Sequence, residues 1–254
     1  MIGLFDSGSG GLSVLSALRK CAPRADIAYF GDIKNAPYGI RSSAELAALT
    51  VAGIEILKSM GATEIVSACN SVSQSVLDGA AGDMPYVEMS APTASYMRVH
   101  QGARTLLIAT PATVDSRMYE KALGGVVLDS LAIAELAGAI EFGRSREEIT
   151  HIVQSAFAER RGEKYDCLIL GCTHYPLVRD VIEKEAQGLG NPAIIDPAES
   201  VADVVARRFD VEGSGTCAFA ISAESPEFRR RVAELFPDTR YTIEVVRNHR
   251  VGKT

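Results

Sequence analysis

Positive charge is scarce in this chain, and long apolar runs are missing from it. Its 254 residues carry 26 Lys and Arg against 32 Asp and Glu, which gives a formal net charge of −6 at pH 7. No basic face is therefore expected on which nucleic acid would bind. Residues 1–6 lack the positive segment and the apolar stretch of a signal peptide, and no later run approaches the length of a membrane span. We expect a soluble protein with neither nucleic acid nor membrane as a partner.

Cysteine is sparse, and its count is odd. The five cysteines are scattered along the chain at positions 21, 69, 167, 172 and 217. A chain stapled by disulfides is usually short, cysteine-dense and even in its cysteine count. We therefore expect reduced thiols and a cytoplasmic location.

Short apolar runs alternate with helical patterns along the chain. Runs typical of strands cover residues 2–5, 27–30, 65–67, 86–89, 105–109, 126–128, 167–170, 193–195 and 217–221. Helical patterns include residues 12–18, 44–60, 147–160 and 201–209. This βαβ rhythm is typical of a parallel sheet covered by helices on both faces. At 47% hydrophobic residues, the chain is long enough for a large core and for two domains.

Two segments are nearly alike: residues 67–71 (SACNS) and residues 170–174 (LGCTH). Each follows an apolar run, so Cys69 and Cys172 are predicted at the carboxyl ends of buried strands. The repetition indicates a duplicated α/β plan with one cysteine in each half. We therefore predict two similar doubly wound parallel-sheet domains with the active site in the cleft between them. The predicted domains are residues 1–92 plus 210–254, and residues 93–209.

Matched thiols indicate a two-sided reaction. Two acid/base groups on opposite faces of one carbon can remove a proton from one side and return it from the other, which inverts the carbon. Both cysteines could instead be small buried residues of the core. A zinc site is a further alternative, but Cys167-x₄-Cys172 with His174 lacks the usual paired spacing and a clear fourth ligand.

The glycine-rich segment at residues 6–11 (DSGSGG) follows the first predicted strand and opens the first helix. Main-chain N–H groups bind anions at such a place, so a substrate carboxylate is a candidate ligand. A dinucleotide fingerprint is the nearest alternative, but Ser13 stands where its last small residue is required, and Asp6 would face the pyrophosphate. A tight turn would explain the glycines but not Asp6 and Ser7.

Three other features carry candidate site residues. His174 follows Cys172 by two positions, and it is either a proton-transfer aid or a polar group at the start of a helix. The turn-rich loop at residues 31–39 either binds the substrate or closes a surface. Glu141, after the apolar stretch 136–140, is either catalytic or part of a solvated helix face.

These segments together resemble the glutamate racemases of the cofactor-independent aspartate/glutamate racemase superfamily. The matching segments span most of the chain and are residues 5–14, 29–32, 37–39, 68–71, 112–114, 171–177 and 195–199. The resemblance implies two α/β domains that face a closed cleft, commonly in a homodimer. It also implies that the product D-glutamate serves peptidoglycan synthesis.

The resemblance also implies roles for individual residues. Cys69 and Cys172 would be the two bases, the first acting on D-glutamate and the second on L-glutamate, and Asp6 and His174 would assist them. The residues that would hold the substrate's amino and carboxylate groups are Ser7, Pro37, Tyr38, Gly39, Asn70, Ser71 and Thr173. No cofactor or metal is implied. A pyridoxal enzyme would need a Schiff-base lysine, and only Lys34 of the seven lysines lies in a segment predicted near the site.

The chain departs from the family pattern in three places. Ser71 stands where threonine is usual, residues 89–92 (MSAP) replace V-I-E-P, and residues 133–141 (IAELAGAIE) replace C-P-x-x-V-P-L-x-E. These departures leave the substrate specificity and the role of Glu141 open. The basic tail at residues 247–253 receives no role.

We therefore expect an amino-acid racemase acting on glutamate. One alternative is a racemase of aspartate or another small acid, or a related isomerase or decarboxylase. Another is a non-catalytic dicarboxylate-binding protein, although binding alone would need neither thiol.

Overall fold

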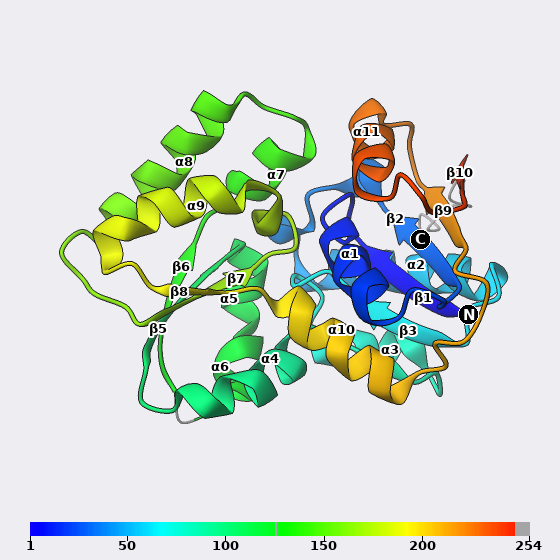
Figure 1. The fold of residues 1–254 in the computed structure, drawn as a ribbon, viewed down its shortest axis with the longest axis horizontal. Coiled ribbons are helices and arrows are strands. Elements are labelled where there is room, and N and C mark those ends of the chain that lie inside the picture. Colours follow the sequence, from blue (N-terminus) through cyan, green and yellow to red (C-terminus); the bar gives the residue numbers. More distant parts are fainter. Residues whose placement is uncertain (125, 247–254) are drawn as a thin grey trace.

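The computed structural model describes residues 1–124 and 126–246 and consists of two parallel sheets covered by helices (Figure 1). The basic tail singled out above lies outside these residues. Within them, no helix is long and apolar enough to cross a membrane. The predicted α/β class with two doubly wound parallel-sheet domains is confirmed, although one sheet has six strands and the other four.

The first sheet has the order β10-β9-β2-β1-β3-β4, and all its pairings are parallel. Its strands are β1 (Ile2–Asp6), β2 (Ile27–Gly31), β3 (Glu64–Ser67), β4 (Tyr86–Val87), β9 (Cys217–Ile221) and β10 (Tyr241–Val245). One core joins its first face to α1 (Leu12–Cys21), α10 (Pro197–Arg208) and α11 (Pro226–Leu235). Another core joins the opposite face to α2 (Ser43–Ser59) and α3 (Gln74–Ala81).

The second sheet has the order β6-β5-β7-β8 and is also parallel. Its strands are β5 (Arg104–Ala109), β6 (Val127–Ala132), β7 (Cys167–Gly171) and β8 (Ala193–Ile195). On one face, α7 (Leu136–Glu141), α8 (Arg146–Ala158) and α9 (Arg179–Ala186) pack against Leu106, Ile108 and Leu168. On the other face, α4 (Ser90–Met97) and α6 (Met118–Ala122) pack against Leu107 and Ile169, and α5 (Pro111–Ser116) lies between β5 and α6.

Local sequence explains where several helices begin. Ser42 and Glu45 form a capping box at α2, and Ser145 and Glu148 form one at α8. Asp196 accepts a hydrogen bond from the amide of Ala198 at the start of α10, where a proline occupies the first turn.

All nine predicted strands are present, with small differences in their ends. The strand predicted at residues 86–89 stops at Val87, because Glu88 turns its carboxylate back onto the amides of Ser90 (2.5 Å) and Ala91 (2.7 Å) and caps α4. The strand predicted at 126–128 instead runs from Val127 to Ala132. Strand β10 was not predicted.

The predicted domain boundaries remain a prediction, and the packing of α10 bears on them. The sequence assigned this helix to the second domain, but its buried residues Val201, Ala202 and Val205 share a core with Leu12 and Leu15 of α1. The chain crosses to the second sheet near α4, after β4, and returns between β8 and α10. We propose that the first domain resumes near residue 197 rather than at residue 210.

Candidate functional site

The two matched cysteines lie where each half of the molecule ends a strand of its sheet. Cys69 follows β3 of the first sheet by one residue, and Cys172 directly follows β7 of the second, as the apolar runs predicted. The two residues are 5% and 6% exposed, so the site is closed. The proximity of Cys172 contributes to raising the pKa of Cys69, so the two side chains lie near each other across the interface.

Cys69 is held as a neutral thiol in this closed state. Burial raises the pKa of its thiol to about 12, and the carboxylate of Asp6 adds to the rise. Hydrogen bonds from the main chain of Ser71 and the side chain of Ser7 act in the opposite direction. The predicted site residues Ser7 and Ser71 therefore lie beside the first thiol.

Cys172 has a charged partner instead. Its Sγ lies 3.7 Å from Nδ1 of His174, and the other ring nitrogen, Nε2, lies 2.7 Å from Oε2 of Glu141. Burial alone would lower the pKa of His174, but hydrogen bonds to Cys172 and Glu141 raise it from 6.5 to about 10. His174 is therefore an imidazolium at neutral pH, and such a neighbour favours the thiolate form of a cysteine.

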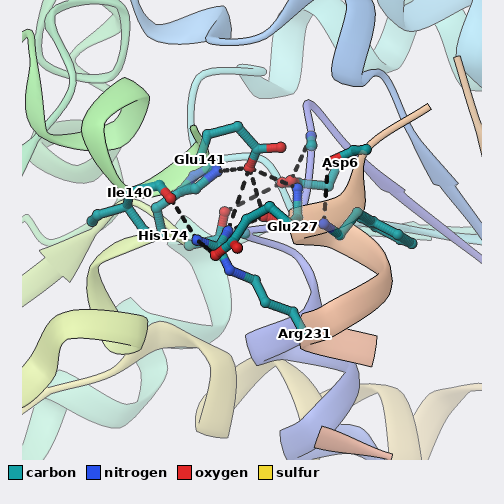
Figure 2. A network of polar contacts seen from close by, with 12 residues as sticks. Asp6, Ile140, Glu141, His174, Glu227 and Arg231 are labelled. Carbon is teal, nitrogen blue, oxygen red and sulfur yellow. Dashed lines mark hydrogen bonds and ion pairs between the residues drawn. The ribbon is translucent and has the colours of Figure 1, made fainter. Parts of the chain in front are cut away.

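Glu141 is the centre of a buried polar network (Figure 2). Its Oε2 accepts hydrogen bonds from the amide of Ser9 at 3.0 Å and the hydroxyl of Ser9 at 2.6 Å, besides its contact with His174. Burial would raise the pKa of Glu141, yet these partners lower it from 4.5 to about 2. At 2% exposure, Glu141 is not part of a solvated helix face, so that alternative is wrong.

The glycine-rich turn binds an anion, but the anion is a side chain of the protein. We expected a substrate carboxylate there, whereas the amide of Ser9 binds Glu141 and the amide of Gly8 binds Asp6 at 2.9 Å. A Cβ on Gly8 would lie 2.7 Å from the Glu141 carboxyl carbon, and one on Gly10 would lie 2.6 Å from Nδ1 of His174. The glycines are therefore needed for the second half to approach the turn this closely.

Asp6 ends β1 and lies fully buried between the two cysteine segments. Its Oδ1 accepts a hydrogen bond from Thr173 Oγ1 at 3.2 Å, which joins the two halves. Burial raises the pKa of Asp6 above its ordinary 3.8, although the charge of His174 counteracts part of the rise. Asp6 is thus a buried carboxylate at the interface, and its charge contributes to raising the pKa of Cys69.

Hydroxyl and amide groups surround the first thiol. Ser71 Oγ lies 3.1 Å from Thr110 Oγ1 of the second half, and Asn70 Oδ1 accepts a hydrogen bond of 2.5 Å from the hydroxyl of Tyr119. The amide nitrogen Nδ2 of Asn70 is buried and has no hydrogen-bond partner among residues 1–124 and 126–246. An unpaired buried donor is costly, so this one is available for a ligand acceptor such as a carboxylate.

The loop at residues 31–39 also reaches the interface. Tyr38 is buried, and its hydroxyl donates to Asp32 Oδ2 at 2.7 Å, which leaves its oxygen lone pairs for a donor. A Cβ on Gly39 would lie 2.4 Å from Thr110 Cβ, and Pro37 faces Gly138 of α7. Lys34, in the same loop, is exposed to solvent.

Four residues of the site were missed by sequence reasoning: Ser9, Thr110, Tyr119 and Arg231. Ser9 lies inside the glycine turn, so that turn was the available signal. The other three sit on elements whose approach to the site depends on domain packing, and nothing local in the sequence marks them.

The zinc alternative finds no support in the geometry. Cys167 begins β7, whereas Cys172 follows its end, so a strand separates them. In residues 1–124 and 126–246, no group of three or more His, Cys, Asp or Glu side chains is placed to hold a metal ion.

The fold and site define a two-domain parallel α/β protein with one thiol from each domain in a buried interface. The Asp/Glu/Hydantoin racemase family matches residues 9–205, and the chain belongs to this family. The family resemblance indicated by the sequence motifs is thereby confirmed.

Individual relatives agree over most of the chain. A glutamate racemase of Koribacter versatilis is 34% identical over 221 residues, which are 83% of this chain and 75% of that protein. The structure of a glutamate racemase isoform from Bacillus anthracis superposes with a TM-score of 0.84 at 29% identity and covers 97% of both chains. The glutamate racemase of Aquifex pyrophilus gives a TM-score of 0.80 at 31% identity, covering 96% of this chain and 97% of that one.

Proposed function

We propose that this protein is a glutamate racemase that works without a cofactor, with Cys172 acting on L-glutamate and Cys69 on D-glutamate. The single observation that carries the proposal is the placement of two buried thiols on strand ends of different domains. Two acid/base groups that approach one carbon from two sides are what inversion requires.

In the L-to-D direction, the Cys172 thiolate removes the α-proton of L-glutamate: the Cα–H bond breaks and an S–H bond forms. The electron pair left on Cα is delocalised into the α-carboxylate. The Cys69 thiol then gives its proton to the opposite face of Cα and becomes a thiolate. Each thiol thus ends the turnover in the other's starting state, and a proton exchange restores the enzyme.

The two halves of the site suit this asymmetric starting state. His174 supplies a positive charge 3.7 Å from Cys172, whereas Cys69, with a pKa of about 12, starts as the proton donor. The unpaired Asn70 amide, with Ser7, Ser71 and Thr173, would hold the carboxylate that takes up the developing charge. Tyr38 and the loop residues Pro37 and Gly39 would line the amino-group side.

The test is proton exchange in D₂O with pure L-glutamate, followed by NMR and optical rotation. Wild type should form D-glutamate that carries deuterium at Cα. Cys69→Ser and Cys172→Ser should each lose at least about 10²-fold in racemisation with the fold retained, because serine is nearly isosteric and far less acidic. A single variant that still interconverts both enantiomers near the wild-type rate contradicts the two-base mechanism, and wild type that only binds glutamate supports a non-catalytic role.

Substrate choice is tested by comparing three amino acids. One methylene is worth about 1–3 kcal/mol in a pocket, so aspartate should be poorer than glutamate by roughly 10- to 200-fold. Glutamine should be poorer still, because its amide places donors where a carboxylate is expected. If kcat/KM is highest for aspartate, the two cysteines keep their roles but the glutamate assignment is wrong.

We further propose a cytoplasmic homodimer whose product, D-glutamate, is used for peptidoglycan. Restored growth of a bacterial strain that requires D-glutamate would support this use, and light scattering of the purified protein would test the dimer. A monomer at all concentrations or failure to restore growth would contradict the respective proposal.

A further inference from the structure

Arg231 reaches the site from α11, the helix that follows the last central strand of the first sheet. It is 7% exposed, and its guanidinium is shared among several partners (Figure 2). Nη1 donates to the hydroxyl of Ser9, and Nη2 donates to the main-chain oxygen of Ile140 at 2.5 Å. Nη2 also lies 2.8 Å from Glu227 Oε1, and Nη1 lies 3.8 Å from Glu141 Oε2.

The contact of Arg231 with Ser9 fixes the direction of the hydrogen bond between Ser9 and Glu141. A serine hydroxyl has one proton, and an N–H donor can only occupy one of its lone pairs. Because Arg231 donates to Ser9 Oγ, the serine proton is free to point at Glu141 Oε2, 2.6 Å away. The same carboxylate oxygen receives His174 Nε2 at 2.7 Å. A continuous chain of contacts therefore runs from Arg231 through Ser9, Glu141 and His174 to Cys172.

Charges alternate along this chain. Arg231 and His174 are positive and flank the negative Glu141, and His174 in turn faces Cys172. Other ionisable groups near this network include Asp6 of β1, Tyr29 of β2 and Glu227 of α11. Glu227 pairs with Nη2 of Arg231, whereas Glu141 lies nearest to Nη1, so the two carboxylates occupy different nitrogens of the guanidinium.

Arg231 also joins the two domains. The helix α11 belongs to the first sheet's core, whereas Ile140 and Glu141 end α7 of the second. A planar guanidinium with several fixed donors can hold Ser9 and the end of α7 at once, which a single ammonium group cannot do in the same geometry.

We propose that Arg231 is a positioning residue for the Cys172 half of the reaction, holding Ser9 and the end of α7 so that Glu141 keeps His174 aimed at Cys172. It contacts no reacting atom. This inference rests on the proposed racemase function and adds to it a residue outside the substrate pocket.

The test compares Arg231→Met and Arg231→Lys with Arg229→Met as the matched control. Arg229 lies on the same helix and forms an exposed pair with Glu224 rather than with a residue of the site. Arg231→Met should lower kcat/KM for glutamate by about 10²-fold, because misplacing a catalytic group by about 1 Å has such an effect. Arg231→Lys should recover part of the loss, and Arg229→Met should behave as wild type.

Isotope effects separate a Cys172-specific role from a general structural one. The enantiomers have equal free energies in water, so kcat/KM must fall equally in both directions in any variant. If only proton transfers at Cys172 are slowed, the primary isotope effect on kcat/KM with [2-²H]-L-glutamate should rise, because removal of the deuteron by Cys172 becomes rate-limiting. With [2-²H]-D-glutamate the isotope effect on kcat/KM should fall, because Cys69 removes the deuteron and the later proton transfer from Cys172 limits the rate. Isotope effects that change in parallel, or not at all, overturn the proposal.

Thiol labelling provides a second readout that needs no turnover. With limiting iodoacetamide at pH 7.5, mass spectrometry should show a lower ratio of Cys172 to Cys69 labelling in Arg231→Met than in wild type. Ser9→Ala removes the hydroxyl that links Arg231 to Glu141 and should shift this labelling ratio in the same direction. It replaces Arg231→Met in the test if that variant fails to fold. If wild type does not racemise glutamate, the proposed function fails, whereas an unchanged labelling ratio in both variants would independently overturn the role of Arg231.

Discussion

The contact between Glu141 and His174 should give the protein a distinctive dependence of stability on pH. Glu141→Gln keeps the size of the side chain and removes its charge. The pKa of Glu141 is lowered from 4.5 to about 2, a difference that corresponds to about 3 kcal/mol of stabilisation. Breaking a buried ion pair by removing one partner typically costs about 3–5 kcal/mol, in agreement with this value. The raised pKa of His174 reflects its hydrogen bond to Cys172 as well as the interaction with Glu141, so it is not added to this value.

The sign of each contribution follows from the direction of its pKa change. The lowered pKa of Glu141 stabilises the fold above pH 4.5, and this contribution is lost as the pH falls towards about 2. The raised pKa of His174 stabilises the fold below pH 6.5, and this contribution is lost as the pH rises from 6.5 to about 10. The difference in unfolding free energy between wild type and Glu141→Gln should therefore be largest, about 3 kcal/mol, between pH 4.5 and 6.5.

Urea denaturation of both proteins at pH 3.5, 5.5 and 9.5 measures this difference. Glu183→Gln is a suitable control, because Glu183 forms an exposed pair with Arg179, 2.6 Å away. Such a surface pair is worth about 0.2–1 kcal/mol, and its loss should differ little between pH 5.5 and 9.5. If Glu141→Gln destabilises the protein equally at pH 5.5 and 9.5, the interaction with His174 is not ionic and the reasoning about the imidazolium is refuted.

Two further predictions follow from the site. Gly10→Ala should destabilise the protein by about 1–3 kcal/mol and lower racemase activity, because its Cβ would lie 2.6 Å from both His174 Nδ1 and Thr173 Oγ1. Gly79→Ala is the control, because its Cβ would meet no atom of the described residues within 4 Å. Equal behaviour of the two variants in urea denaturation and activity assays would contradict this prediction. Activity should survive dialysis against EDTA and treatment with a carbonyl reagent but not thiol alkylation, which bound glutamate should slow. Loss of activity that zinc or pyridoxal phosphate restores would contradict the proposed chemistry.

Local sequence was sufficient to predict most of the sheet. Strands of a parallel sheet are buried on both faces, so they read as short apolar runs, and every run of this kind proved to be a strand. Strand β10 was missed because it lies at the edge of the sheet and none of its residues is fully buried. Its sequence, YTIEV, therefore carries no continuous apolar run.

The site was predictable only where its residues adjoin a strand end. The segments around Asp6, Cys69 and Cys172 can be recognised in the sequence, because small and polar residues follow apolar runs there. Contacts between distant segments were not visible: Ser9 meets Glu141 across 132 positions, and Arg231 meets Ser9 across 222. Such pairings are set by how the domains pack, and no local periodicity encodes them. The glycine turn was predicted to hold a substrate carboxylate, whereas the structure places the carboxylate of Glu141 on the amide of Ser9.

Each half of the molecule supplies groups that orient the reactive residues of the other. Ser9 of the first half holds Glu141, which faces His174 of the second, and Tyr119 of the second half holds Asn70 of the first. The thiols are 5% and 6% exposed, so glutamate cannot reach them while these contacts are all in place. Admission of substrate must separate some of the same contacts that prepare the thiols for proton transfer. Closure of the interface around glutamate would then restore these contacts and reassemble the acid/base groups around the bound substrate.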